Sequence, residues 1–505
     1  MTNPLFDRLF QRHAGSAAPF LMLPGGDQIT YGAFLEDAAR YAHVLVAQGL
    51  RPGDRLAVQI PKSPQALILY AAAVQAGVIF LPLNTAYTGR EVAYFLDNSG
   101  ARLLVCDPAN AAELSPLMDG RVLTLDAQGQ GSLQAAAAAQ PREFATVPRT
   151  EADLAAFLYT SGTTGRSKGA MLTQANLLSN AETLAAHWHF TKDDVLLHAL
   201  PIYHTHGLFV ALNVMLSVGG AMIFLPKFDQ DQMIALMPRA TTMMGVPTFY
   251  TRLLDDPRFT ADLTRDMRLF ISGSAPLLAD THIAFEERTG HRILERYGMT
   301  ETNMNTSNPY SGERRAGTVG MPLPGVELKV TGPDGNSVPQ GEIGVIEVRG
   351  PNVFQGYWQM PEKTAAELRA DGWFITGDLG QIDADGYVSI VGRGKDLIIS
   401  GGFNIYPKEI ELVLDEHPGV LESAVIGVPH PDFGETPVGV LVASGEGPDL
   451  AALQGAVKAE LARFKHPSKY VVVQELPRNT MGKVQKNVLR ETYKGLFQPA
   501  GTAAP

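Results

Sequence analysis

The sequence predicts a layered α/β protein that is followed by a small α+β unit. Strand-like runs alternate with helical runs up to about residue 390, which is the pattern of α/β domains. Examples are residues 55–60 before a helix near 64–77, and residues 268–272 before a helix near 279–290. From Gly317 onward glycine, proline and valine become frequent and the expected strands are short, at 326–330, 344–349 and 387–391.

A charged, glycine-containing stretch over residues 392–396 is typical of a boundary between domains. Beyond it the sequence predicts a helix over 407–414, strands over 422–428 and 438–442, and a helix over 450–463. Asp449 precedes this last helix and is expected to cap its N-terminus. The C-terminal part is therefore expected to form a compact α+β unit of its own.

The composition is that of an ordinary soluble globular protein. The chain has 505 residues, of which 45% are hydrophobic and 18% charged, and 41 basic against 52 acidic residues give a net charge of −11. An acidic chain is a poor candidate for non-specific nucleic-acid binding. Cys106 is the only cysteine, which fits a reducing cytosol, and as the end of an apolar run it is expected to be a buried strand residue.

Two uncharged stretches, 63–89 and 207–226, are long enough to span a membrane. Each contains an apolar helical run, a glycine, a strand-like run and then Leu-Pro, so buried α/β units are the better interpretation. The N-terminus lacks the basic-then-apolar order of a signal peptide. The similarity of the two stretches indicates two related α/β halves.

The segment from Tyr159 to Gly169 is rich in glycine and hydroxylated residues and contains Lys168. Glycines allow a close approach to a ligand, and backbone N–H groups, hydroxyls and a lysine can all donate to phosphate oxygens. It is not a Walker P-loop, because that motif requires Gly-Lys-Ser/Thr in succession and here Arg166 and Ser167 precede the lysine. Strand-like residues on both sides predict a loop between two strands. A flexible turn without a ligand is the alternative.

Two short motifs place carboxylates where a nucleotide could use them. Thr300 and Glu301 put a hydroxyl beside a carboxylate, which can hold Mg²⁺ near a triphosphate, and Tyr297 can stack on a base. Asp378 follows a strand-like run, where a carboxylate can accept from both hydroxyls of a ribose. The alternatives are a surface turn for the first motif and an ordinary aspartate in a turn for the second.

Two further segments contain histidines and a lysine. His204 and His206 have no nearby Cys or His ligands, so a histidine turn that faces a pocket is a better interpretation than a metal site. Near the C-terminus Lys483 follows Gly482 in a glycine turn. By itself such a lysine is usually solvated surface.

Taken in order, these segments resemble signature motifs of the ANL adenylate-forming superfamily, which contains acyl-CoA synthetases, adenylation domains and luciferases. The matching segments are 160–169, 297–301, 376–378, 392–402 and Lys483, and the usual proline before the loop lysine is Ser167 here. The resemblance covers nearly the whole chain. It implies a large N-terminal domain (1–394) of layered α/β subdomains with a small β-barrel-like part, a small mobile α+β C-terminal domain (397–505) that carries Lys483, and a hinge at 395–396.

The resemblance also implies roles for individual residues. Thr160 and Glu301 are expected to hold Mg²⁺, Asp378 to bind the ribose with help from Arg393, and Lys483 to reach the α-phosphate and the carboxylate. The residues expected to contact ATP are Thr160, Ser161, Gly162, Thr163, Thr164, Gly165, Lys168, Gly273, Ser274, Ala275, Arg296, Tyr297, Gly298, Met299, Thr300, Asp378 and Arg393.

The implied chemistry has two steps. Attack of a carboxylate on the α-phosphorus expels pyrophosphate and gives an acyl-adenylate, and Lys483 and Mg²⁺ neutralise the charge that develops at phosphorus. The small domain is then expected to turn about Asp396 and to bring Gly401, Gly402 and Phe403 towards the pantetheine tunnel, where a thiolate releases AMP.

Residues 201–208, 244–252, 272–274, 295–306 and 477–487 are most similar to the malonyl-CoA synthetases of this superfamily. Those enzymes ligate malonate, and in some cases methylmalonate, to coenzyme A. The second carboxylate of such an acid needs a buried cation, and arginine can bind it through two parallel hydrogen bonds. Arg252 is the first candidate, and the expected supporting residues are Ser274, Arg296 and His206. Thr205 and Met304 are expected to limit the space at C2. A structural salt bridge is the alternative for Arg252.

The sequence therefore predicts an AMP-forming malonate–CoA ligase that uses ATP, Mg²⁺ and coenzyme A. It is expected to be a cytoplasmic monomer or homodimer whose partners are small molecules, without nucleic acid or membrane. The alternatives are an acyl-CoA ligase for another short-chain or aryl acid, a stand-alone adenylation enzyme that loads a carrier protein, and a nucleotide-binding regulatory protein that has lost catalysis. Intact Lys483, Glu301 and Asp378 argue against the last alternative.

Overall fold

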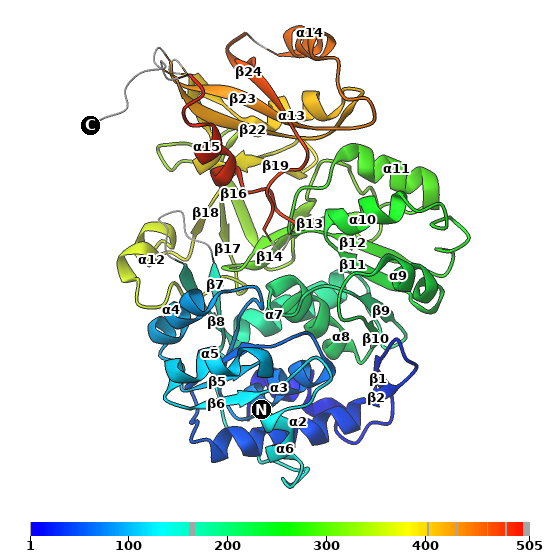
Figure 1. Ribbon diagram of the computed structural model, residues 1–505, viewed down its shortest axis with the longest axis vertical. Coiled ribbons are helices and arrows are strands. Elements are labelled where there is room, and N and C mark those ends of the chain that lie inside the picture. The colour runs from blue at the N-terminus through cyan, green and yellow to red at the C-terminus, as the bar shows by residue number, and fades with distance from the viewer. Residues whose placement is uncertain are drawn as a thin grey trace.

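The protein was analysed as a computed structural model, which describes residues 2–160, 167–400, 403–430, 433–461, 463–479 and 482–497. Its strands form sheets of six, nine, four and five members. Figure 1 shows the two largest sheets in the lower and middle part of the molecule, the C-terminal sheet at the top and the four-stranded sheet between them.

The six-stranded sheet has the order β6-β5-β3-β4-β7-β8. Its first five members pair in parallel, whereas β7 and β8 form an antiparallel hairpin whose connection is the glycine-rich loop. The strands are β3 (Arg55–Gln59), β4 (Ile79–Pro82), β5 (Leu103–Cys106), β6 (Val122–Thr124), β7 (Leu154–Thr160) and β8 (Lys168–Thr173). The helices are α2 (Tyr31–Ala47), α3 (Pro64–Gln75), α4 (Gly89–Ser99), α5 (Ala111–Leu114) and α6 (Ser132–Ala137). The predicted loop between two strands is confirmed.

The nine-stranded sheet has the order β15-β14-β13-β12-β11-β9-β10-β1-β2. Its central strands run parallel, and β2, β14 and β15 pair antiparallel at the two ends. The strands are β1 (Pro19–Met22), β2 (Gln28–Thr30), β9 (Val195–His198), β10 (Ala221–Phe224), β11 (Thr242–Gly245), β12 (Leu269–Ser272), β13 (Leu294–Met299), β14 (Asn303–Ser307) and β15 (Met321–Pro322). The helices are α1 (Pro4–Leu9), α7 (Gln174–His187), α8 (Asn213–Val218), α9 (Gln230–Leu236), α10 (Pro247–Leu254) and α11 (Ala279–Thr289).

The two apolar stretches noted in the sequence fold as the same kind of unit. α3 is followed by Gly77 and β4, and α8 is followed by Gly219 and β10. Gly77 has φ +68° and Gly219 has φ +78°, which side chains with a Cβ rarely adopt, so glycine permits the turn from helix to strand. In the described part of the chain no helix is long and apolar enough to cross a membrane.

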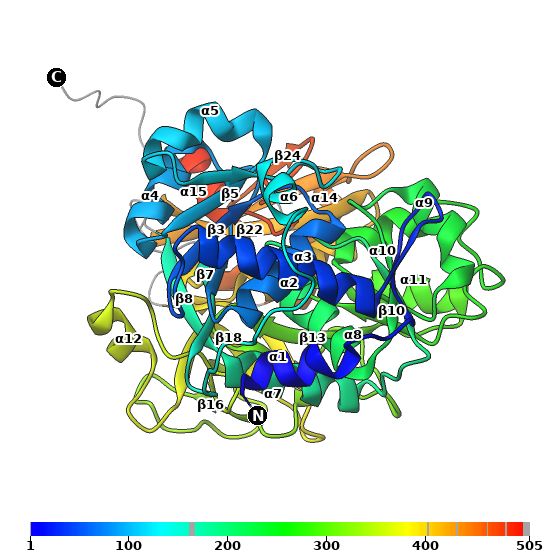
Figure 2. The same ribbon diagram turned by 90° about the horizontal axis from the view of Figure 1, so that it is seen from below.

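One apolar core fills the space between the two large sheets and extends under the four-stranded sheet. A second core with α4 covers the other face of the six-stranded sheet and contains Cys106, which is fully buried as predicted, and burial raises the pKa of its thiol to about 11. Seen from below, α2 and α3 lie side by side across the bottom of the molecule (Figure 2).

The part expected to be barrel-like is a four-stranded antiparallel sheet, β16-β17-β18-β19. Its strands are β16 (Glu327–Thr331), β17 (Gly344–Arg349), β18 (Phe374–Ile382) and β19 (Val388–Arg393), and α12 (Pro361–Glu367) lies between β17 and β18 in the chain. A 3₁₀ turn, Gly394–Asp396, then leads to the C-terminal sheet.

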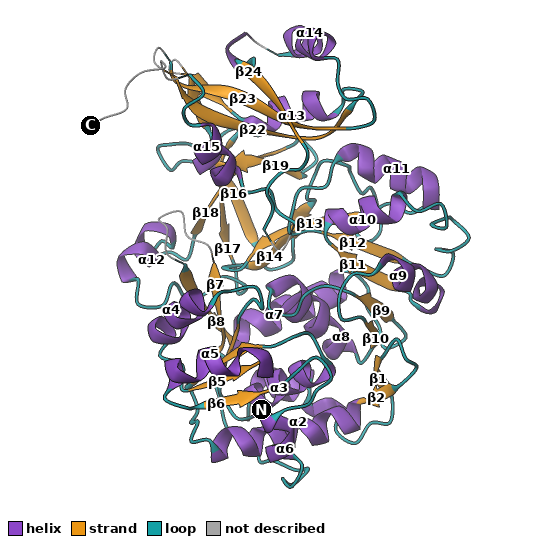
Figure 3. Cartoon of the chain, viewed as in Figure 1, coloured by secondary structure: helices purple, strands orange, loops and turns teal. Residues whose placement is uncertain are grey.

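The C-terminal sheet has the order β21-β20-β23-β22, and β24 pairs with β23. α13 and α14 pack on one face and α15 on the other (Figure 3). Its strands are β20 (Ile398–Ser400), β21 (Phe403–Ile405), β22 (Val420–His430), β23 (Gly434–Ala443) and β24 (Lys469–Val473), and its helices are α13 (Pro407–Asp415), α14 (Leu450–Glu460) and α15 (Lys486–Tyr493).

The predicted start of α14 is confirmed and its predicted end is wrong. The Asp449 carboxylate accepts from the backbone N–H groups of Ala451 and Ala452, at 2.9 and 3.2 Å. The helix stops at Glu460 because Leu461 has an extended backbone, and residues Arg463–Lys465 form a separate 3₁₀ turn.

A substitution at the first helix-to-strand turn should be destabilising. Gly77→Ala places a Cβ at positive φ and 2.9 Å from the Arg149 side chain, so we expect a loss of about 1–2 kcal/mol in the free energy of unfolding. Gly25→Ala is the control, because Gly25 has no positive φ and open space around it, and should change stability by less than about 0.5 kcal/mol. Urea titration measures both; equal effects would contradict the role of φ at Gly77.

Candidate active site

Asp378 lies at the junction of the four-stranded and nine-stranded sheets. It is 3% exposed, and its two oxygens are both bonded: Tyr297 Oη donates to Oδ2 at 2.6 Å and Arg393 Nε lies 2.7 Å from Oδ1. The Thr-Gly-Asp spacing has a local reason, because the Thr376 hydroxyl accepts from the Asp378 N–H at 3.1 Å and Gly377 turns the chain with φ +71°. The structure thus brings together three residues that the sequence assigned to the nucleoside.

A second carboxylate, that of Glu301 in the turn between β13 and β14, lies beside Thr160 at the end of β7. It is 5% exposed, and Thr160 Oγ1 lies 3.4 Å from its Oε1. Burial raises the pKa of this carboxyl, so a cation bound beside it would favour the ionised form. Hydroxyl and carboxylate oxygens are the ligands that Mg²⁺ prefers, with phosphate oxygens and water completing its shell. This donor set fits the predicted magnesium site.

Tyr357 and Glu367, which the sequence did not single out, complete this region. Tyr357 Oη lies 3.0 Å from Glu301 Oε1 and 2.7 Å from Glu367 Oε2, so one hydroxyl bridges two carboxylates. Lys168 is 8% exposed, with its Nζ 3.4 Å from Glu367 and 4.2 Å from the centre of the Tyr357 ring. Glu367 ends α12, far along the chain from Lys168, and no local pattern links the two.

The other loop residues assigned to the triphosphate lie outside the described residues. They are Ser161, Gly162, Thr163, Thr164 and Gly165. Thr160 and Lys168, which flank them, end β7 and begin β8 as Cα partners in the hairpin.

Lys483 reaches this region from the C-terminal unit. Its hairpin is closed by Asn479, whose carbonyl oxygen accepts from the Gly482 N–H at 2.9 Å and whose side-chain oxygen accepts from the Lys483 N–H at 2.9 Å. Desolvation, and next the positive charge of Arg393, lower the pKa of Lys483 to about 8. Burial, then Arg296 and then Lys483 lower the pKa of His204, so the charge of Lys483 also acts on the histidine turn.

Arg296 on β13 is a buried cation at the site. It is 3% exposed, its Nε and one terminal nitrogen are buried without a hydrogen-bond partner, and no carboxylate in the described ranges forms an ion pair with it. Burial lowers the pKa of this guanidinium to about 10. Gly273 allows its position, because a Cβ there would lie 2.4 Å from the Arg296 Cζ. A buried guanidinium without a counter-ion is costly and indicates an anionic ligand.

A histidine turn lies against this arginine. His206 Nδ1 is 3.1 Å from Ser274 Oγ, while His206 Nε2 and Thr205 Oγ1 are buried without partners. Burial, and then Arg296, hold the pKa of His206 well below its usual range, so the ring is neutral. Ser274 has φ +73°, a conformation that non-glycine residues rarely adopt and that is frequent at functional sites. The residues His206–Leu212 form a π-helix, which is also frequent at such sites.

Arg252 does not have the environment that the sequence led us to expect. Arg252 is exposed in the last turn of α10, and its guanidinium lies 5.7 Å from the centre of the Phe228 ring. The buried cation at this site is Arg296 instead of Arg252. Arg296 is on strand β13, where the adjacent turn covers its side chain, whereas Arg252 is in the last turn of α10, which faces outward.

The remaining predicted residues lie on strands and turns around the same space. Met304 is 2% exposed on β14, and a Cβ at Gly298 would lie 2.7 Å from its Cε. Ala275, Met299 and Thr300 are half-buried.

The predicted hinge residue Asp396 ends the 3₁₀ turn, and Arg490 of α15 donates to its carboxylate. Gly401 and Gly402 lie outside the described residues, and Phe403 begins β21.

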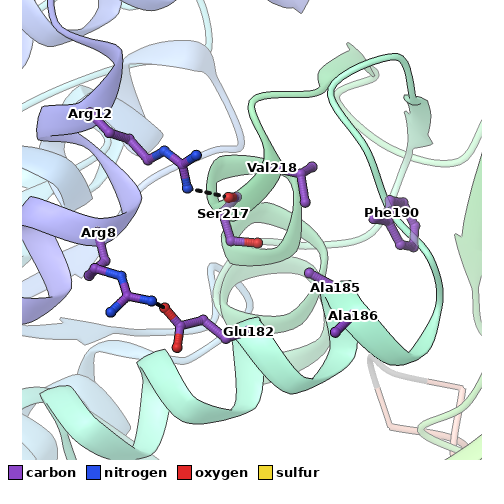
Figure 4. A pocket seen from close by; sticks show the side chains of 8 residues that line it. All are labelled: Arg8, Arg12, Glu182, Ala185, Ala186, Phe190, Ser217 and Val218. Carbon is purple, nitrogen blue, oxygen red and sulfur yellow. Dashed lines mark hydrogen bonds and ion pairs between the residues drawn. The ribbon is translucent and has the colours of Figure 1, made fainter.

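A separate hollow of about 360 Å³ opens between α1, α7 and α8 (Figure 4). Its two cations are already used: Arg8 pairs with Glu182, and Arg12 donates to the Ser217 carbonyl oxygen at 2.7 Å. That carbonyl belongs to the last turn of α8, so Arg12 caps a helix rather than offering an anion site.

Asp378 and Glu301 come from the large part of the molecule, and Lys483, whose charge interacts with that of Asp378, comes from the C-terminal unit. This division of one site between two units is characteristic of adenylate-forming enzymes. The chain belongs to the AMP-binding enzyme family, which matches residues 6–358, and the C-terminal domain of AMP-binding enzymes matches residues 409–483.

Relatives agree with this assignment. A feruloyl-CoA synthase from Amycolatopsis sp is 38% identical over 475 residues, covering 93% of this chain and 95% of that protein. A malonate–CoA ligase from Arabidopsis thaliana is 32% identical over 545 residues, covering 97% and 89%. The crystal structure of ATP-bound MatB from Rhodopseudomonas palustris is 58% identical, has a TM-score of 0.96 and covers 99% of this chain and 100% of that one, whereas apo MatB gives a TM-score of 0.86.

These findings confirm the predicted adenylate-forming superfamily and the predicted AMP-forming acid–CoA ligase. The mixed α/β fold with a small C-terminal unit is confirmed as well.

The lowered pKa of Lys483 predicts a pH dependence. The ammonium form is present below the folded-state pKa and is lost as the pH rises through about 8, so kcat/KM for ATP should fall above that pH, up to tenfold per unit. Lys483→Arg keeps its charge and should move the decline to higher pH, whatever its absolute rate. A wild-type profile that stays flat to about pH 10 would show that this ammonium is not required.

Proposed function

We propose that this enzyme ligates malonate to coenzyme A through malonyl-adenylate, giving malonyl-CoA, AMP and pyrophosphate. The observation that carries the proposal is the buried, unpaired guanidinium of Arg296 beside His206 and Ser274. A dicarboxylate offers one carboxylate to this cation and one to the nucleotide. The likeness to MatB and to a malonate–CoA ligase supports the same acid.

In the first step one malonate carboxylate oxygen bonds to the α-phosphorus of ATP, and the bond from phosphorus to the bridging oxygen breaks to release pyrophosphate. Asp378 accepts from the ribose hydroxyls, and Lys483 donates to the α-phosphate and the reacting carboxylate. Lys168 and the loop before it bind the outer phosphates. The charge of the Lys483 ammonium is worth most at this stage, when negative charge develops at phosphorus.

Thr160 and Glu301 are the residues that would hold Mg²⁺. The ion would supply charge neutralisation on the phosphate oxygens. Tyr357 keeps the Glu301 carboxylate in place through its hydroxyl, and Glu367 accepts from the same hydroxyl and from Lys168.

In the second step the thiol sulfur of coenzyme A bonds to the carbonyl carbon of malonyl-adenylate, AMP leaves with the bonding electron pair, and the thiol proton goes to solvent. For this step the C-terminal unit turns about Asp396, which withdraws Lys483 and brings Gly401, Gly402 and Phe403 to the pantetheine. The match of this chain to ATP-bound MatB, closer than to its apo form, supports an arrangement suited to the first step.

Two alternatives are kept for the acid and the acceptor. An aryl acid, as in the feruloyl-CoA synthase, would place an apolar ring beside the Arg296 guanidinium and leave the charge unpaired, which disfavours it. A carrier-protein thiol could replace that of coenzyme A. Thr205 and Met304 are proposed to face C2 of the acid and to set the preference between malonate and methylmalonate.

A substrate panel tests the proposal. Acid-dependent exchange of pyrophosphate into ATP should be strongest with malonate, weaker with methylmalonate, and slight with acetate or coumarate. AMP release should then require coenzyme A rather than a phosphopantetheinylated carrier. Lys483→Ala is the negative control and should lower exchange about 10²–10³-fold. An enzyme that ignores malonate while using a monocarboxylate disproves the proposed acid.

The two candidate arginines can be separated by substitution. Arg296→Ala should raise KM for malonate by the equivalent of about 2–5 kcal/mol, more than it raises KM for ATP, because a desolvated charge pair is lost. Arg252→Ala should have an effect of less than about tenfold, because an exposed charge contributes at most about 1 kcal/mol. Acetate kinetics are the control, since acetate has no second carboxylate. The reverse order of effects would restore Arg252 as the main cation.

A further inference from the structure

We propose that Lys62 is a positioning residue that holds the histidine turn of the acyl pocket through His198. This inference rests on the proposed function, because it assigns the turn at Thr205 and His206 to acid selection.

Lys62 lies in the loop between β3 and α3, immediately before Ser63, which caps α3. Its amine reaches from the six-stranded sheet to the nine-stranded sheet. Lys62 Nζ is 2.8 Å from His198 Nδ1, 3.0 Å from the His198 carbonyl oxygen and 4.3 Å from the centre of the Phe224 ring. In the part of the chain that the structure describes, no carboxylate pairs with this amine, and burial lowers its pKa well below the usual range. A buried lysine that bridges two sheets without a counter-ion differs from an ordinary solvent-exposed lysine.

The contacts of His198 fix its tautomer. Its residue is 1% exposed, and burial, with Lys62 next, lowers its pKa to about 3, so the ring carries one proton at neutral pH. Its Nε2 lies 2.9 Å from the Gly207 carbonyl oxygen, which can only accept. Nε2 therefore carries the proton, and Nδ1 must accept, from Lys62. Without a donor at Nδ1 the tautomer with the proton on Nε2 is no longer favoured by that hydrogen bond. The Gly207 carbonyl oxygen would then accept a hydrogen bond in only part of the molecules.

Gly207 is held tightly in the turn that forms the pocket wall. A Cβ on it would lie 2.0 Å from the Pro201 carbonyl oxygen, so the backbone at this point has little freedom. It directly follows Thr205 and His206, whose Oγ1 and Nε2 are buried without partners. A shift of the Gly207 peptide would therefore move both side chains, and with them the contact from His206 to Ser274.

The positions of the residues predict which step is affected. The Lys62 amine hydrogen-bonds to His198, and the His198 ring hydrogen-bonds to the Gly207 carbonyl oxygen of the turn. Among the described residues, neither side chain hydrogen-bonds to a residue assigned to the nucleotide. Disturbing them should weaken acid binding and selection and leave ATP binding intact. A structural lysine would instead lower stability, or affect all substrates alike.

The variant Lys62→Met keeps the stem and removes the donor. We expect KM for malonate to rise about tenfold, the equivalent of one hydrogen bond. The preference for malonate over methylmalonate should fall, with KM for ATP unchanged. Lys62→Arg retains a donor and should recover most of the loss. Lys227→Met is the matched control, because Lys227 is exposed just beyond β10, and should behave as wild type.

A second measurement needs no substrate and so does not depend on the acid. The ¹⁵N signals of the His198 ring, assigned with His198→Gln, should show the proton on Nε2 in the wild type and a mixture of tautomers in Lys62→Met. Unchanged ring signals would overturn the proposed role of Lys62, as would wild-type malonate KM and selectivity in Lys62→Met, or equal losses for malonate and ATP. If Lys62→Met does not fold, Lys62→Ala, which also removes the donor, gives the same test through its ring signals. Failure of wild type to use malonate would overturn the proposed function alone, and the ring signals would still report on Lys62.

Discussion

The carboxylate of Asp378 accepts from Tyr297 and Arg393 and so joins the four-stranded sheet to the nine-stranded sheet at one buried point. The Arg393 strand leads directly to the turn that ends at Asp396, and Arg490 of the C-terminal unit holds that turn. The position of Lys483 depends on the same connection. A ligand that competes for Asp378 therefore acts on the place where the three parts of the molecule meet.

A buried charge without a partner costs stability, and this protein keeps such a group, the Arg296 guanidinium, at its acyl pocket. Arg296 has two unbonded nitrogens and lies against the histidine turn, and Lys62 supports that turn from the six-stranded sheet. The free energy lost in the empty protein is recovered only when an anion enters. Such a pocket favours dicarboxylates by charge, while Thr205 and Met304 act on size.

The phosphate side of the site depends on a different kind of network. Tyr357 shares one proton between Glu301 and Glu367, and Lys168 lies against both the ring and the second carboxylate. Because every polar group in this set has a partner, the carboxylate proposed to hold Mg²⁺ is already oriented before the nucleotide binds. When the nucleotide binds, these side chains exchange hydrogen-bond partners, and the site does not have to be assembled first.

The sequence by itself determined the family, the hairpin with its glycine-rich loop and the units α3–β4 and α8–β10, and it supplied Asp378, Glu301 and Lys483 as candidates for the site. Each of these depends on neighbours in the chain: turn glycines, alternating apolar runs, or a short motif with its own hydrogen bonds, as in Thr376–Asp378. Burial and long-range contact depend instead on how the sheets pack. Only the tertiary structure could therefore exchange Arg252 for Arg296 as the buried cation, bring Glu367 to Lys168, and place Lys62 against His198. Those pairs lie far apart in sequence, and nothing local records which side chain the packing will remove from water.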